Sequence, residues 1–132
     1  MVCNTLPVMR LATLVIQNAV RLIGLILIVL GFLFWTHHSY NLVPLHMYLG
    51  VTLVILLWIM AALAIGAKMK PALAIIAFLW GVLVLYFGMN MGRMLPGPAH
   101  EVIRVSHFFI GLAAIGLSES LGARVKRSLV TA

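Results

Sequence analysis

The placement of the charged residues is the feature that most constrains this chain. No Asp, Glu, Lys or Arg occurs between Arg21 and Lys68, and elsewhere the basic residues flank long apolar segments. Charged residues make up 8% of the chain, whereas they make up about 25% of a soluble domain. Because so few polar residues cannot coat a water-soluble globule, we expect an integral membrane protein that contacts the lipid bilayer along its length.

The apolar segments predict an all-α fold, a transmembrane up-down-up-down four-helix bundle. A helix needs about 20 residues to cross a bilayer, and the spans are expected at about 22–38, 44–67, 71–92 and 98–123 of a single membrane domain, 1–132. Connections this short make neighbouring helices antiparallel. Residues 8–20 carry Arg10, Thr13 and Gln17 near one face. We expect this segment to form a separate short amphipathic helix in the membrane interface.

The distribution of basic residues predicts the orientation of the bundle. Seven of the nine Lys and Arg residues fall at one predicted end, and only Arg93 and Arg104 fall at the other. The positive-inside rule then places both termini in the cytoplasm. We attribute the net charge of +7 to topology and lipid headgroups and expect no nucleic-acid partner, because the basic residues form no patch interleaved with exposed aromatic residues.

All the histidines fall toward the outer end of this predicted bundle. They are His37, His38, His46, His100 and His107. Two of them begin a repeated unit, with His46 four residues before Gly50 and His107 four residues before Gly111. Residues four apart share a helix face, so each of these histidines lies one turn from a position without a side chain. A nitrogen ligand beside a gap is the local geometry that a flat, bulky cofactor needs, and an ionisable residue inside a membrane is a functional hypothesis by default.

We predict that His46 and His107 are the two axial ligands of a haem b. The second and fourth helices of such a bundle are diagonal partners, so the two imidazoles can face each other across the core. Small residues such as Gly24 and Gly31 continue the inward faces. Stripes of this kind also serve simply as helix-packing surfaces.

The remaining histidines and two arginines give secondary predictions. His38 or His37 opposite His107 is the fallback ligand pair, and use of both pairings together with His100 would accommodate two haems. Arg93 and Arg104 lie toward the same end. An arginine fork matches a carboxylate, so either one is a candidate partner for the haem propionates.

With four spans, an outer histidine cluster and two His-x-x-x-Gly units, the chain resembles the small four-helix b-type cytochromes of bacterial membranes, over about residues 22–123. The resemblance implies haem between inward-facing histidines and electron exchange with quinol or a partner redox subunit. It also implies a location in the bacterial inner membrane. Because two histidine ligands leave no open iron position, we expect an electron carrier, or a subunit of a larger membrane complex, more than a stand-alone enzyme.

Two other hypotheses stay open at this point. Met89, Met91 and Met94 lie close to the histidine cluster, and thioether and imidazole ligands suit copper, so the chain is alternatively a copper-handling membrane protein. A histidine-ligated pigment of the chlorophyll type would use the same slot as a haem. The third hypothesis is a cofactor-free structural subunit, because the sequence has no catalytic triad, phosphate-binding loop or carboxylate pair.

Overall fold

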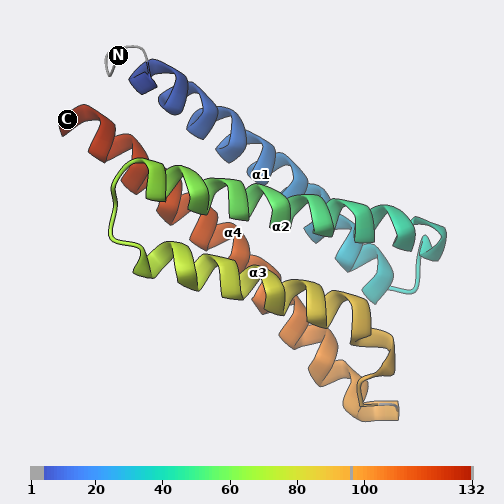
Figure 1. The fold of residues 1–132 in the computed structure, drawn as a ribbon. Coiled ribbons are helices and arrows are strands. Elements are labelled where there is room, and N and C mark those ends of the chain that lie inside the picture. Colours follow the sequence, from blue (N-terminus) through green and yellow to red (C-terminus); the bar gives the residue numbers. More distant parts are fainter. Residues whose placement is uncertain (1–4, 96, 132) are drawn as a thin grey trace.

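The computed structural model describes residues 5–95 and 97–131, and its long elements are all helices (Figure 1). The α-helices are α1 (Thr5–Trp35), α2 (Val43–Gly66), α3 (Ala72–Asn90) and α4 (His100–Thr131). Short 3-10 helices occupy the outer connections, namely η2 (Tyr40–Leu42), η3 (Met91–Arg93) and η4 (Gly97–Ala99). Each of the four α-helices is long and apolar enough to cross a membrane, which confirms the predicted transmembrane bundle.

Consecutive helices run antiparallel, and the start of α1 and the end of α4 lie at the same end of the bundle (Figure 1). Each helix packs on its neighbours in the order α1, α2, α3, α4, and α4 closes the bundle against α1. The helices α2 and α4 also contact each other across one diagonal. The predicted diagonal relationship between the second and fourth spans is therefore present in the fold.

Turn-forming residues set the ends of the helices. After α1 ends at Trp35, His37 and Ser39 have positive φ angles of 62° and 59°, which reverse the chain within a few residues. Pro44 lies in the first turn of α2 and Pro71 is the N-cap of α3. Proline is tolerated there because the first N–H groups of a helix have no partner within the helix.

The N-terminal region corrects one expectation. Residues 8–20 are the first part of the continuous helix α1 and not a separate interfacial helix. Two residues of the polar face that suggested an interfacial position are turned into the bundle, since Thr13 is 0% and Gln17 2% exposed, while Arg10, Leu11 and Val15 are exposed. Polar side chains in membrane helices face the bundle interior, and no helix breaker separates this segment from the rest of α1.

The inner half of the bundle is closely packed. Leu57, Met60 and Leu121 are among its fully buried side chains, and the Trp58 indole covers Gly81. Two indole N–H groups form hydrogen bonds between helices. Trp58 Nε1 donates to the Phe78 carbonyl at 3.1 Å, and Trp80 Nε1 donates to the Ile110 carbonyl at 3.0 Å. This packing fixes the helices below the site described next.

Candidate cofactor site

A cavity of about 600 Å³ lies in the outer half of the bundle, and all four helices line it. Most of the lining is apolar. The basic and imidazole side chains in the lining are His46, His100, Arg104 and His107. Cavities of roughly 300–1,000 Å³ with an apolar lining and a few convergent polar groups are the usual form of cofactor and ligand sites.

His46 of α2 and His107 of α4 meet across this cavity. Their ring centres are 6.3 Å apart and their ring planes differ by 52°. A metal–imidazole bond is about 2.0 Å long and the bonded nitrogen lies about 1.2 Å from its ring centre, so two imidazoles on opposite sides of one metal ion have centres about 6.4 Å apart. The observed separation of the ring centres is close to this value.

The polar atoms of these two rings lack protein partners. In both His46 and His107, Nδ1 is buried and makes no hydrogen bond. The Nε2 atoms of the two rings are not buried and unpaired in this way. Leaving a buried polar group unpaired costs about 1–3 kcal/mol. Because both Nδ1 atoms are buried, Nε2 is the nitrogen of each ring that a ligand could reach.

The glycines divide into two groups. An added Cβ at Gly31, Gly50, Gly92 or Gly111 would have no atom within 4 Å, and all four positions line the cavity. By contrast, an added Cβ at Gly24 would lie 2.7 Å from Ile115 Cδ1. These four glycines therefore border open space, whereas Gly24, Gly81 and Gly122 bring helices into close contact.

Arg104 is held in the wall of the cavity. Its Nη1 donates to Glu101 Oε1 at 2.6 Å, one turn earlier on α4, and its guanidinium carbon lies 5.1 Å from the Trp35 ring centre. Nη2 also donates to the Phe34 carbonyl at 3.5 Å. With its side chain 17% exposed, Arg104 lines the same cavity as the two histidines while its charge is paired with Glu101.

Of the other predicted site residues, some line the cavity and some do not. His100 lines the cavity, with Nδ1 3.1 Å from the Met94 carbonyl. His37 and His38 do not line it: His37 Nδ1 lies 2.7 Å from the Tyr40 hydroxyl, in the connection that follows α1. Because α1 ends at Trp35, His38 lies outside the helix and does not share the inward face of Gly24 and Gly31. Arg93, in η3, is also absent from the lining.

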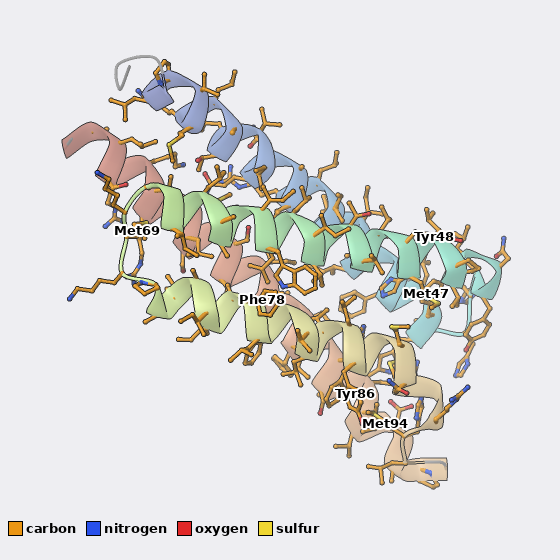
Figure 2. The ribbon with its side chains drawn as sticks, in the orientation of Figure 1. Met47, Tyr48, Met69, Phe78, Tyr86 and Met94 are labelled. Carbon is orange, nitrogen blue, oxygen red and sulfur yellow. The ribbon has the colours of Figure 1, made fainter. Side chains whose placement is uncertain are left out.

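Some of the methionines near the histidines line the cavity and others do not. Met89 and Met91 line the cavity and Met94 does not, while Met47, which the sequence did not single out, does. Figure 2 labels Met47 near the outer end of α2 and Met94 beyond α3. Within the described residues no group of three or more His, Cys, Asp or Glu side chains could hold a metal ion. A metal ion held by the two facing imidazoles would therefore have to bring further ligands of its own, or take thioether ligands.

Aromatic residues complete the site, and sequence reasoning missed them. The Phe34 ring packs edge-on against His46, with ring centres 5.5 Å apart. Phe108 follows His107 on α4 and packs against Phe32 of α1. In an apolar helix a phenylalanine that faces a cavity has the same sequence signal as one that faces lipid.

No family model, curated protein or solved structure matches this chain.

Proposed function

We propose that the chain is a membrane electron carrier that binds one haem b in the outer cavity, with His46 and His107 as axial ligands. The observation that carries this proposal is the 6.3 Å separation of the two imidazole centres across a cavity of about 600 Å³. A haem needs only two protein ligands because its macrocycle supplies the others, so the absence of a larger ligand cluster among the described residues is compatible with it.

The lining residues have distinct roles in this proposal. His46 and His107 supply one nitrogen each, while Gly50 and Gly111 leave room beside them for a planar macrocycle. The apolar side chains exclude water and favour the less charged form of the cofactor. Arg104, rigidly held by Glu101 and Trp35, supplies a positive charge for a propionate. Arg93 has no place in this assignment.

Haem contributes one-electron oxidation and reduction when bound. Ligation by both histidines would leave no free iron position for oxygen, so the proposed function is electron transfer and not oxygen chemistry. The proposed partners are quinol in the bilayer or a redox subunit docked at the histidine end. We further propose the bacterial inner membrane, with both termini in the cytoplasm, because the basic residues concentrate at the end that carries the termini.

The spectrum of the purified protein tests the haem proposal. Protein expressed with added haem precursor should give a reduced-minus-oxidised difference spectrum of b type, at one haem per chain. His46→Ala and His107→Ala should each abolish it. His37→Ala and His38→Ala are the matched controls, since these imidazoles lie outside the cavity, and both should keep the full spectrum. Full occupancy in His46→Ala or His107→Ala, or loss in the controls, would reject the assignment.

Copper is the second candidate, and one observation favours it. The thioethers of Met47, Met89 and Met91 line the same cavity as the two imidazoles, and such soft ligands select Cu(I). A colourless preparation that contains one copper per chain, lost in His46→Ala, would favour this function over haem. A preparation with neither haem nor copper would favour the structural-subunit hypothesis.

Cysteine labelling tests the proposed orientation. In a Cys3→Ser background, Arg93→Cys in the outer connection should react with an impermeant maleimide on intact spheroplasts. Lys68→Cys in the connection between α2 and α3 should react only after the membrane is opened. The reverse pattern would place the termini outside.

A further inference from the structure

A second hollow lies at the opposite end of the bundle from the histidines. This groove, of about 530 Å³, runs between the α2–α3 connection and α4. Its lining consists of Met69, Lys70, Ala72, Leu73, Ile76 and Arg124. Figure 2 labels Met69 in this connection, and Figure 1 shows the same connection close to the C-terminal part of α4. The groove shares no residue with the histidine cavity.

The two cations of the groove have no carboxylate partner among the described residues. The chain contains two acidic residues, and both are already paired. Glu119 binds Arg21 at 2.8 Å, and Glu101 binds Arg104 at 2.6 Å. Lys70 and Arg124, from different elements, therefore converge on one groove with their charges uncompensated by any described residue.

The order of chemical groups along the groove matches that of a phospholipid. Lys70 lies in the connection just before α3, whereas Leu73 and Ile76 follow on α3 toward the membrane interior, and Ile76 is exposed. Positive charge thus lies at the rim and apolar surface lies below it. The first turn of α3, which has no side-chain cap, adds the partial positive charge of a helix N-terminus at the rim.

We propose that this groove binds an anionic phospholipid, with its phosphate between Lys70 and Arg124 and its acyl chains along Leu73 and Ile76. Basic pockets between transmembrane helices are known sites for anionic headgroups. The inference does not depend on the haem proposal, because the two sites lie at opposite ends of the bundle. The proposal gives Lys70 and Arg124 a binding role in addition to their contribution to membrane topology.

Native mass spectrometry of the full chain in a neutral detergent tests the proposal, with phosphatidylglycerol or phosphatidylcholine added in equal amounts. Phosphatidylglycerol should give a saturable one-lipid state that phosphatidylcholine does not. Each basic residue near a membrane surface contributes about a fivefold change in affinity. The Lys70→Gln/Arg124→Gln variant should therefore bind phosphatidylglycerol about 25-fold more weakly.

The charge-matched control is Arg10→Gln/Lys126→Gln, which removes two positive charges outside the groove lining. This control should keep the one-lipid state. Equal weakening in both double variants would mean diffuse attraction and would overturn the site. Inorganic phosphate should neither form a stable adduct nor displace the lipid at equal concentration, because it lacks acyl chains. If it binds as well as the lipid, the groove is a simple anion site and the lipid assignment fails.

Discussion

Replacing single glycines by alanine separates cavity-facing glycines from packing glycines, which look alike in the sequence. Gly50 and Gly111 have no atom within 4 Å of an added Cβ. In a helix interior, glycine is less favourable than alanine by about 1 kcal/mol. Gly50→Ala and Gly111→Ala should therefore each stabilise the cofactor-free bundle by about 1 kcal/mol.

Gly81→Ala should have the opposite effect. Its new Cβ would press on the Trp58 indole and lie 3.0 Å from Val54 Cγ1. The indole cannot move away freely, because its Nε1 donates to the Phe78 carbonyl. Overpacking costs about 1–3 kcal/mol, and the alanine preference offsets about 1 kcal/mol of that. The net change is a loss of about 0–2 kcal/mol, so the two classes should differ by about 1–3 kcal/mol.

Unfolding by sodium dodecyl sulfate in mixed micelles, followed by circular dichroism, measures these differences in haem-free protein. A loss of stability in Gly50→Ala and Gly111→Ala as large as in Gly81→Ala would refute the reasoning, because it would mean that side chains fill the space beside the histidines. The larger change Gly111→Leu extends the test. It should leave the haem-free bundle folded while lowering haem occupancy.

Three further predictions concern individual contacts. Trp80→Phe removes the interhelical hydrogen bond to the Ile110 carbonyl and should cost about 0.6 kcal/mol, and at most about 1.7 kcal/mol, in the same unfolding assay; no change would mean that the bond is not formed. Glu119→Gln removes the carboxylate that binds Arg21 through two hydrogen bonds; because the Arg21 side chain is 58% exposed, the loss of stability should be at most about 1 kcal/mol, and a larger loss would contradict an exposed pair. Replacing Met47, Met89 and Met91 together by leucine should leave the haem difference spectrum unchanged, and its loss would instead implicate thioether ligands.

The sequence was sufficient to predict the fold because the membrane leaves few alternatives. Long apolar segments without charges must form helices in lipid, and short connections make neighbours antiparallel. The N-terminal segment was harder, since Thr13 and Gln17 have the same spacing whether they face headgroups or the bundle interior. Their burial depends on a tertiary contact with α4, where Gln17 Nε2 donates to Glu119 Oε2 at 3.0 Å. Gln17 and Glu119 are 102 residues apart, so no local sequence pattern indicates that they form a pair.

Helical periodicity and bundle topology were enough to predict part of the candidate site. His46 lies in the first turn of α2 and His107 about two turns into α4, so the helical period gave their faces and the bundle topology brought them together. The positions of His37 and His38 depend on where α1 ends, and helix ends are set by turn conformations that periodicity does not report. Periodicity also does not show which glycines border open space and which are tightly packed, because this depends on the side chain opposite each glycine.

The electron paramagnetic resonance spectrum of the air-oxidised, purified protein is the sharpest test of haem binding by His46 and His107, because it reports the metal and its ligands together. A single low-spin ferric haem species of bis-imidazole type, at one spin per chain, is the result that the facing rings of His46 and His107 predict. A high-spin ferric signal, a cupric signal or the absence of any metal signal would contradict the account.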